Sequence, residues 1–373
     1  MTILLLFDIM KGGFEIKIRR RTMAEKTVII GMSGGVDSSV AAYLLKEQGY
    51  NVIGVTMDTA IEGINDDKMQ ETVNDAKRVA DMLGIEHVVL NFRDEFKEKV
   101  VNYFIDEYMN GRTPNPCNVC NRTIKWQMLL NMFEKFNADF VATGHYARID
   151  KLDNGRYAIR NSITANKDQT YALYNLTQEQ LEKTIMPVGE YTKDEIRKIA
   201  EKIGLFVASK PDSQDICFIP DKDYNSFIEK YSGKSSVEGN FVDVTGNIIG
   251  KHKGITNYTI GQRKGLGIAM GHPVFVTEIR KASNEVVIGE NDDLFKTEVM
   301  VTDFNFMGIS EEDIDREFIG KIRYSHKGTR CHLKKVDENK YLCIFDEAVR
   351  AATPGQALVI YDGEYVAGGG TLI

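Results

Sequence analysis

The sequence has few cysteines, few prolines and no excess of positive charge. Its 373 residues include five cysteines and seven prolines. An odd, low number of cysteines in a chain of this length argues against a secreted disulfide framework and favours thiol or metal chemistry in a reducing compartment. Because the formal net charge is −7, a nucleic acid would have to bind a local basic patch rather than the bulk charge.

Long apolar runs are also missing. Residues 3–10 (ILLLFDIM) are interrupted by Asp8 and followed by basic residues, whereas a signal peptide begins with its charge and ends at a small-residue cleavage site. A membrane-spanning helix needs about 20 apolar residues. We interpret residues 1–22 as an extension from an upstream start codon, with Met23 opening the functional chain; an extra strand or a frayed tail is the alternative. Both interpretations predict a cytoplasmic protein without a membrane partner.

The composition is that of an ordinary globular protein, with 43% hydrophobic and 27% charged residues, which excludes collagen, coiled coils and wholesale disorder. At about 150 residues per domain, the length predicts two or three domains. Up to about residue 200, apolar runs alternate with helical periodicity. We expect strands at residues 27–31, 51–57, 86–90 and 139–142, and helices at 38–48, 67–83 and 94–109. Strands separated by helices predict a parallel sheet, so this part is of the α/β class.

The pattern changes near residue 236, where short β-branched runs alternate with glycine and asparagine turns. Such runs predict β-hairpins. From about residue 297 a further series of strands predicts a small barrel. We therefore expect a catalytic domain at residues 23–230, a small mainly-β central domain at 231–293 and a C-terminal β-barrel domain at 294–373.

A glycine-rich turn lies between the first predicted strand and the first predicted helix. It reads SGGVDS over residues 33–38. Glycines let the backbone approach an anion, and free N–H groups at the start of a helix bind phosphate oxygens. The turn has no P-loop lysine and no G-x-G-x-x-G pattern, so it is neither a Walker A nor a dinucleotide-binding motif. The alternative is a plain turn whose serine and aspartate only cap the helix.

Three cysteines are candidates for thiol chemistry. Cys117 and Cys120 form a C-x-x-C after a double proline turn, and Cys217 lies far downstream in KPDSQDICFIP. A thiolate is a nucleophile, and nearby cations lower the pKa of a thiol. The neighbouring cations that favour such reactivity are Arg112, Arg122 and Lys125.

Other readings of the cysteines remain open. A lone C-x-x-C also fits a redox pair or half of a zinc site. No second C-x-x-C follows and the histidines are scattered, which disfavours a four-ligand zinc site. Cys331 and Cys343 fall on predicted strands, so we expect both to be buried structural thiols.

Six segments follow one another along the chain: SGGVDS, GRTPNPCNVCN, ATGHYAR, KDQTYAL, KPDSQDICF and TIGQRKGLG. Together they resemble the bacterial tRNA-specific 2-thiouridylase family of the PP-loop ATP pyrophosphatase superfamily, from about Lys26 to the C-terminus. The resemblance implies an adenine nucleotide alpha hydrolase-like parallel-sheet domain followed by a small mainly-β domain and a β-barrel. GMP synthetase and argininosuccinate synthetase would share the PP-loop but not the two cysteine segments.

The resemblance also implies an activity. These enzymes thiolate C2 of the wobble uridine, position 34 of tRNA, using ATP and Mg²⁺: O2 is adenylated, sulfur from a cysteine persulfide replaces it, and 2-thiouridine, AMP and pyrophosphate result. The implied partners are the tRNA anticodon stem-loop and a sulfur-donor protein, either a cysteine desulfurase or a persulfide carrier. By the same resemblance, Cys120 matches the nucleophile, and Cys217 matches the persulfide carrier that can form a disulfide with Cys120.

The resemblance also assigns the remaining site residues, because their positions match binding residues of the family. The positions that match the family's nucleotide-binding residues are Gly31, Met32, Ser33, Gly34, Gly35, Val36, Asp37, Ser38, Met57 and Gly144. Asp37 would help to position Mg–pyrophosphate, a role that the resemblance does not fix, and Met57 is otherwise a plain core methionine. The positions that match base-facing and tRNA-contacting residues are Asn115, Pro116, Cys117, His145, Lys167, Asp168, Gln169, Arg323, Tyr324 and Gln356.

One position departs from the family pattern. The family often shows Asp-x-x-Cys, whereas Cys117 stands where that aspartate would be. Three thiolates at Cys117, Cys120 and Cys217 are what an iron–sulfur cluster with one open coordination site would need. Two mechanisms therefore stay open: a persulfide on Cys217 resolved by Cys120, or a cluster held by all three cysteines. Two further alternatives are another PP-loop enzyme (an amide ligase or a different nucleotide thiolase) and a non-catalytic RNA-binding or sulfur-relay protein.

Local basic groups are the candidates for phosphate contacts. They are Lys251, His252, Lys253, Arg263, Lys264, Lys321, Arg323, His326, Lys327 and Arg330; the alternative for each group is a charged, solvated strand edge. Tyr146, Tyr258 and Tyr324 are candidates for stacking on bases, although isolated aromatics are more often core residues. We expect Trp126, after the C-x-x-C, to be a packing residue.

Overall fold

A five-stranded parallel sheet forms the first part of the described chain. The computed structural model describes residues 26–211 and 216–373, so the interpretation of residues 1–22 lies outside the described residues. The sheet has the order β3-β2-β1-β4-β7, with every neighbouring pair parallel. The strands are β1 (Thr27–Gly31), β2 (Asn51–Asp58), β3 (Glu86–Asn91), β4 (Phe140–Ala142) and β7 (Thr184–Ile185). The predicted α/β class is confirmed, and β1 lies in the centre.

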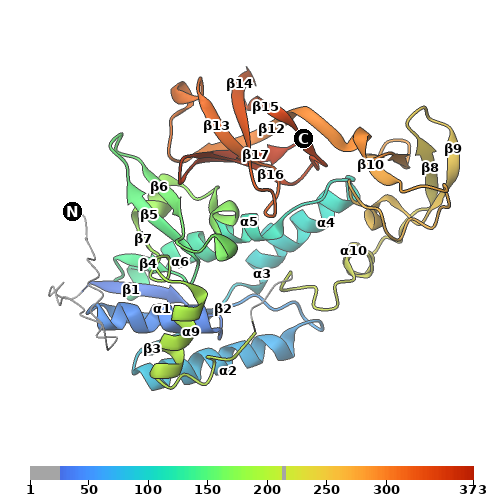
Figure 1. Cartoon of the computed structure of the whole chain (residues 1–373). Coiled ribbons are helices and arrows are strands. Elements are labelled where there is room, and N and C mark those ends of the chain that lie inside the picture. Colours follow the sequence, from blue (N-terminus) through green and yellow to red (C-terminus); the bar gives the residue numbers. More distant parts are fainter. Residues whose placement is uncertain (1–25, 212–215) are drawn as a thin grey trace.

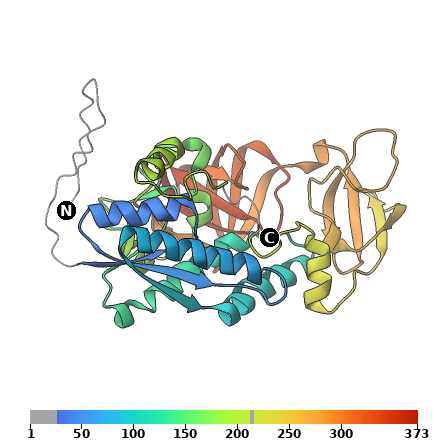
Figure 2. The same cartoon turned by 90° about the horizontal axis from the view of Figure 1, so that it is seen from below.

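Helices cover both faces of this sheet (Figure 1). Val28 and Ile30 point to one face and Ile29 to the other, and all three are fully buried, so the apolar run of β1 fills two cores. Each such burial contributes about 1.5–3 kcal/mol. One face is covered by α1 (Val36–Glu47), α2 (Asp66–Leu83) and α9 (Lys193–Lys202), with α1 and α2 side by side in Figure 2. The other carries α3 (Arg93–Phe96), α4 (Asn102–Met109), α5 (Pro116–Cys120), α6 (Gln127–Leu130) and α7 (Phe133–Phe136).

The helix predicted at residues 94–109 is not a regular α-helix throughout. A π-helical turn, Lys97–Val101, separates α3 from α4, and a second one, Asn121–Trp126, separates α5 from α6. Val100 and Val101, neighbours in sequence, are both buried in the wider turn. Apolar periodicity cannot reveal such a turn, because one extra residue per turn shifts the pattern only slightly. The second π-helical turn follows the C-x-x-C directly, in keeping with the frequency of these turns at functional sites.

The central part is a four-stranded sheet of two hairpins, as the sequence predicts. Its order is β10-β11-β8-β9, with the two antiparallel hairpins joined through the parallel pair β11/β8. The carboxylate of Asp243 closes the β8/β9 turn by accepting hydrogen bonds from Thr245 and Asn247, and these bonds lower the pKa of Asp243 to about 2. The elements are α10 (Tyr224–Ser232), β8 (Gly239–Asp243), β9 (Ile248–His252), β10 (Phe275–Arg280) and β11 (Glu285–Gly289).

Six strands of the C-terminal part close into the predicted barrel, because β12 pairs with both β15 and β17. Its strands are β12 (Phe295–Phe306), β13 (Glu317–Lys321), β14 (Thr329–Asp337), β15 (Lys340–Arg350), β16 (Ala357–Asp362) and β17 (Tyr365–Leu372). Cys331 and Cys343 are fully buried in its core, which confirms the expectation for both. The fold class predicted from the sequence is therefore confirmed in all three parts.

A hairpin from the first part of the chain extends the barrel's sheet. It consists of β5 (Ala147–Lys151) and β6 (Tyr157–Asn161), and β6 pairs with β17. The sequence analysis did not predict this hairpin. It ties the first part to the barrel, since Arg156 Nε also donates to the Met307 carbonyl at 2.9 Å. The short helix α8 (Gln178–Glu182) lies beside β6. Every helix in the described ranges is too short or too polar to cross a bilayer.

Candidate active site

The glycine-rich loop lies at the carboxyl edge of the parallel sheet, where the strand order reverses between β1 and β4. Ligands of open α/β sheets bind at this kind of position. Gly144, which follows β4, lies against the start of α1: a Cβ added to it would come within 2.6 Å of the Ser38 backbone nitrogen. The structure therefore brings together two segments that are far apart in the sequence and that hold the predicted nucleotide-binding residues.

The loop has the features of an anion cradle. Gly34 has a φ of +64°, and a Cβ there would lie 2.9 Å from the Thr72 carbonyl oxygen. Gly35 caps α1 without a side-chain hydrogen bond, so no capping side chain covers the first-turn N–H groups of this twelve-residue helix. The backbone N–H of Ser33 donates to Ser38 Oγ at 3.2 Å, which folds the loop over the helix start. These features fit a bound phosphate chain.

Asp37 is held by an ion pair. Lys193 Nζ donates to both carboxylate oxygens at 2.8 Å, and the Tyr146 hydroxyl donates to one of them at 2.7 Å. Asp37 therefore does not act as a simple helix cap. Lys193 is buried and was not predicted from the sequence. The sequence feature that could have located it is the capping box of Thr192 and Glu195, which starts α9.

A second lysine reaches the glycine-rich loop from the segment before Cys217. Lys210 Nζ donates to Asp75 Oδ2 at 2.7 Å and to the Gly34 carbonyl oxygen at 3.4 Å. With Lys193, this places two lysine ammonium groups around the cradle, both paired with carboxylates. The sequence pointed to the cysteine of this segment, and nothing in its pattern marked Lys210 as a contact of the loop.

The other nucleotide-binding candidates line the base of the loop. Met32 extends β1 by donating its N–H to the Val55 carbonyl oxygen at 2.8 Å. Met57, at the end of β2, is half-buried, and its Cε would lie 3.9 Å from a Cβ added to Gly31. Val36 is buried under the loop. Met57 packs against the core and lies beside Gly31, so its position is compatible with both readings of this methionine.

The three candidate thiols gather at the same edge of the sheet. Phe218 follows Cys217 and packs its ring between Phe96 and Phe104, at 5.6 and 5.4 Å. Helix α5, which carries Cys117 and Cys120, packs on the π-helical turn between those two phenylalanines. The charges of Cys117 and Cys217 raise the pKa of Cys120, and the charge of Cys117 raises the pKa of Cys217. The chain thus brings residues from two distant segments together, as a sulfur transfer between them requires.

The ionisation of Cys120 differs from the expectation. Burial raises the pKa of the Cys120 thiol to about 12, which the charge of Lys125 opposes only in part. Arg112, expected to favour the thiolate, is instead paired with Glu107. Desolvation also raises the pKa of Cys217, although part of that side chain is exposed. Both thiols are therefore protonated at neutral pH in this state, because packing against the core outweighs the nearby cations.

The raised pKa of Cys120 predicts that iodoacetamide alkylates this thiol slowly at pH 8. We expect Cys120 to react at least about tenfold more slowly in the folded chain than in urea, because the thiolate is the reactive form and an unperturbed thiol has a pKa of about 8.5. Quenching at intervals and peptide mass spectrometry measure the rates. Equal rates in the two states would contradict the burial of this thiol, and Cys117, which is exposed, is the internal control.

The three cysteines do not fit an iron–sulfur cluster. Within residues 26–211 and 216–373, no three His, Cys, Asp or Glu side chains come close enough together to hold a metal ion. Cys117 and Cys217 are exposed and Cys120 is partly buried. The cluster alternative is not favoured.

The loop before the C-x-x-C is fixed by the other two parts of the molecule. Gln356 Nε2 donates to the Thr113 carbonyl oxygen at 2.7 Å, and the Thr113 N–H donates to the Pro354 carbonyl at 2.8 Å. Thr113 Oγ1 also donates to Thr259 Oγ1, at 3.4 Å. Asn115 Oδ1 caps α5 by accepting from the Cys117 N–H at 3.1 Å, with Pro116 at the first helical position. The predicted base-facing segment therefore lies where the three parts meet.

His145 lies beside the end of the π-helical turn that follows the thiol-bearing helix, rather than in open solvent. Its Nδ1 is 2.9 Å from Thr143 Oγ1, and its ring centroid is 5.5 Å from that of Trp126. Burial holds the pKa of His145 well below its usual range, with Lys125 acting in the same direction. His145 is therefore neutral at physiological pH. Trp126 is fully buried and donates to Thr184 Oγ1 at 2.8 Å, which confirms it as a packing residue.

The remaining tRNA-contact candidates lie on both sides of the contact between the first part and the barrel. Lys167 ends a 3-10 turn (Ala165–Lys167), and the next residue, Asp168, accepts the Tyr324 hydroxyl on its carbonyl at 3.0 Å. Gln169 Oε1 accepts from the Tyr146 N–H at 2.8 Å. On the barrel side, Arg323 donates to the Arg350 carbonyl at 2.7 Å, and Tyr324 is exposed.

Several of the basic and aromatic candidates for RNA contact are buried, so the prediction was wrong for them. His252 is 1% exposed, and burial lowers its pKa, so it is a core residue of the central sheet and not a phosphate contact. Tyr146 and Tyr258 are buried as well, which leaves Tyr324 as the exposed tyrosine of the three. The exposed members of the basic set are Lys251, Lys253, Arg263, Lys264, Lys327 and Arg330.

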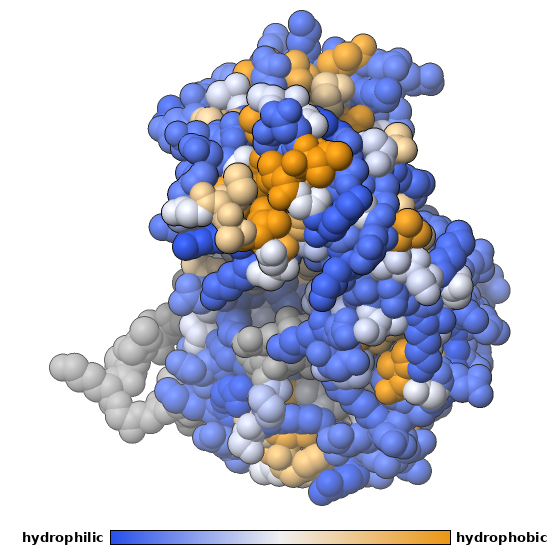
Figure 3. All heavy atoms as spheres, turned by 90° about the vertical axis from the view of Figure 1, so that its right-hand side faces the viewer, coloured by the Kyte–Doolittle hydropathy of each residue, from blue (hydrophilic) through white to orange (hydrophobic). Residues whose placement is uncertain are grey.

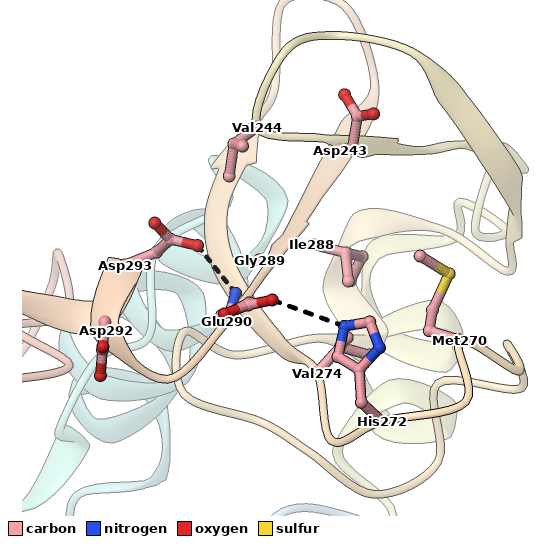
Figure 4. Close-up of a pocket in the computed structure, with 10 residues that line it drawn as sticks. All are labelled: Asp243, Val244, Met270, His272, Val274, Ile288, Gly289, Glu290, Asp292 and Asp293. Carbon is pink, nitrogen blue, oxygen red and sulfur yellow. Dashed lines mark hydrogen bonds and ion pairs between the residues drawn. The ribbon is translucent and has the colours of Figure 1, made fainter.

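A cavity of about 300 Å³ lies in the central part, away from the thiols. Four carboxylates line it, and His272 Nε2 lies 3.7 Å from Glu290 Oε1 (Figure 4). Its lining also includes apolar side chains, and Figure 3 shows apolar residues among the hydrophilic ones at this end of the molecule. The carboxylates are those of Asp243, Glu290, Asp292 and Asp293. A cavity of this charge repels phosphates, so it is not the nucleotide or RNA site.

Three protein families match successive parts of the chain. Residues 26–221 match a family described as a tRNA methyl transferase HUP domain, and residues 225–290 match a tRNA methyl transferase PRC-barrel domain. Residues 296–372 match an aminomethyltransferase beta-barrel domain. Among solved structures, the U34-tRNA thiolase NcsA from Methanococcus maripaludis with its [4Fe-4S] cluster is 25% identical over 55% of this chain and 66% of that chain, with a TM-score of 0.34. That score is too low to support a conclusion about the present site.

Curated relatives match over nearly the whole chain. The tRNA-specific 2-thiouridylase MnmA of Lachnoclostridium phytofermentans is 57% identical over 93% of this chain and 99% of its own length. The protein of the same name from Clostridioides difficile is 53% identical over 93% of this chain and 98% of its own length. The loop, the thiols and the three-part architecture described above lie within these matches. The chain belongs to the MnmA family of tRNA-specific 2-thiouridylases.

Proposed function

We propose that this chain catalyses the ATP-dependent 2-thiolation of uridine 34 in tRNA. The observation that carries the proposal is the meeting of Cys120 and Cys217 at the sheet edge that also holds the glycine-rich loop. Asn65, just beyond β2, donates from Nδ2 to the Cys217 carbonyl at 3.5 Å, and β1 and β2 are neighbours in the sheet. Family membership supports the same activity, since the relatives are named for it.

The first step is activation of the base. The first-turn N–H groups of α1 and the loop backbone hold the phosphates, and uridine O2 attacks the α-phosphorus of ATP so that pyrophosphate leaves. Lys193 and Lys210 offset the negative charge beside the cradle. Mg²⁺ would neutralise charge on the leaving pyrophosphate. Asp37 would hold the ion only after releasing Lys193, with which it is paired.

The second step moves sulfur. The terminal sulfur of a Cys217 persulfide attacks C2, the bond between C2 and the adenylated oxygen breaks, and AMP leaves. The uracil sulfur is then joined to Cys217 Sγ. The Cys120 thiolate attacks that Sγ, the bond to the uracil sulfur breaks with its electron pair on the uracil side, and 2-thiouridine and a Cys120–Cys217 disulfide result. Because Cys120 is protonated in the described state, it must lose its proton during this step.

The tRNA and the sulfur donor are the partners in this proposal. The anticodon stem-loop would lie along the contact between the first part and the barrel, where Tyr324 meets Asp168, with uridine 34 flipped towards the C-x-x-C. A cysteine desulfurase or persulfide carrier would load Cys217, which is exposed. The domain division at residues 23–230, 231–293 and 294–373 and a cytoplasmic location, where tRNA and reduced thiols occur, belong to the same proposal.

Mass spectrometry of tRNA nucleosides tests the function. An unmodified tRNA transcript with uridine at position 34 is incubated with the enzyme, ATP, Mg²⁺, and a cysteine desulfurase with cysteine. We expect 2-thiouridine, with one pyrophosphate released per thiolated base. Pyrophosphate release without 2-thiouridine would favour another PP-loop reaction, and tRNA binding without pyrophosphate release would favour a non-catalytic RNA-binding protein.

A further inference from the structure

A third thiol lies beside the pair that the proposed sulfur transfer uses. Cys117 precedes Cys120 by three residues in α5, and residues three apart in a helix are neighbours on one face. Cys217 approaches from the downstream segment, because its neighbour Phe218 packs on Phe96 and Phe104 and α5 packs on the π-helical turn between those two residues. In keeping with this, the charges of Cys117 and Cys217 both raise the pKa of Cys120. Cys120 is thus a neighbour of both other thiols, one on its own helix and one from the downstream segment.

The residues that follow the two thiols in sequence anchor this helical segment to the chain around residues 172–175. Asn121 Nδ2 donates to the Ala172 carbonyl at 2.8 Å, and Asn175 Nδ2 donates to the Asn118 carbonyl at 3.0 Å. Asn118 and Asn121 are both buried. These hydrogen bonds hold the segment that carries Cys117 and Cys120 in place against residues 172–175.

Exposure distinguishes Cys117 from Cys120. Cys117 is exposed, whereas Cys120 is partly buried and packs against the main hydrophobic core. An external reductant therefore reaches Cys117 more readily than Cys120. Cys117 also acts from within the chain, where a neighbouring group has an effective concentration in the millimolar range or above.

We propose that Cys117 is a resolving thiol that regenerates Cys217 after each transfer. The inference rests on the proposed function, which leaves a Cys120–Cys217 disulfide. The Cys117 thiolate attacks Sγ of Cys120, the Cys120–Cys217 bond breaks, and Cys217 leaves as a thiolate ready to be loaded again. The new Cys117–Cys120 disulfide is then reduced by an external dithiol, of the thioredoxin or dithiothreitol kind, which takes up the oxidising equivalents. A thiol at position 117, where the family often has an aspartate, can carry out this second thiol–disulfide exchange, which a carboxylate cannot.

The test separates the first turnover from the later ones. Enzyme with a persulfide on Cys217 is mixed with tRNA and ATP without reductant, quenched in acid, alkylated and mapped for disulfides. We expect wild-type enzyme to accumulate Cys117–Cys120, and Cys117→Ser to accumulate Cys120–Cys217, each measured per 2-thiouridine formed so that the readout is the disulfide pairing and not the rate of the first turnover. With dithiothreitol and a continuous sulfur supply, the variant should need at least about tenfold more reductant for half-maximal turnover. Cys331→Ala, which removes a buried barrel thiol, is the matched control and should behave as wild type.

Two outcomes would overturn the inference. One is a wild-type enzyme that accumulates only Cys120–Cys217; the other is a Cys117→Ser variant with the wild-type reductant requirement. Cys117→Asp restores the residue that the family often has and guards against a folding defect of the serine variant; it should repeat the serine result. Failure of the wild-type first turnover would contradict the proposed function itself, so the two failures are distinguishable.

Discussion

Replacing Cys217 by serine is expected to reduce the formation of 2-thiouridine by at least about a thousandfold, the scale of loss when a covalent nucleophile is removed. A hydroxyl cannot carry a persulfide, so no sulfur would reach the activated base. ATP binding should persist, because the cradle is formed by residues 31–38 and Gly144, and Cys217 is not part of it. Nucleoside mass spectrometry measures the loss, and isothermal titration with ATP measures the retained binding.

Cys120→Ser should also abolish release of 2-thiouridine, but through a different species. Without the Cys120 thiol, the bond between the uracil sulfur and Cys217 Sγ remains, so a tRNA–protein adduct should accumulate that dithiothreitol cleaves. A denaturing gel without reductant detects it. Cys331→Ala is the control for a lost thiol, since Cys331 lies in the barrel core. Full thiolation by either the Cys217 or the Cys120 variant would contradict the proposed mechanism.

Local patterns were sufficient to predict the parallel sheet and the barrel. The apolar run of β1 is buried on both faces of its sheet, and a series of short strand-like runs from about residue 297 predicted the barrel. The hairpin β5/β6 escaped prediction because its role comes from its pairing with β17, more than two hundred residues away at Tyr365 and Arg160. Such long-range pairing leaves little trace in the hairpin's own residues.

The chemistry-bearing residues were predicted by type, but their electrostatics were not. Cations near Cys120 in the sequence suggested a lowered thiol pKa, whereas packing against the core raises it. Similarly, the sequence predicted that Asp37 positions Mg–pyrophosphate or caps the helix, whereas the structure shows Lys193, from the distant helix α9, on both of its oxygens. The thiol pKa and the ion pair both depend on which groups the fold packs against a residue. Distance along the sequence does not reveal those groups.

The second large effect concerns Gly144. A Cβ at this position would lie 2.6 Å from the Ser38 nitrogen and 2.8 Å from the Asp37 carbonyl carbon, and neither backbone atom can move without displacing the start of α1. We expect Gly144→Ala to weaken ATP binding at least about tenfold, or about 1.4 kcal/mol. Thiolation should fall about a hundredfold, the cost of a displacement of about 1 Å among reacting groups.

Titration calorimetry with ATP and the rate of pyrophosphate release check this prediction, and Gly250→Ala is its matched control. At Gly250, the nearest obstacle to a new Cβ is the Ile268 Cγ2 methyl at 3.1 Å, a side chain that can yield, in the central sheet rather than at the cradle. Both variants should keep the wild-type thermal transition to within a few degrees. If Gly144→Ala bound ATP as tightly as Gly250→Ala, the close contact between the β4 end and the helix start would not form the nucleotide site, and the phosphates would have to bind elsewhere along the sheet edge.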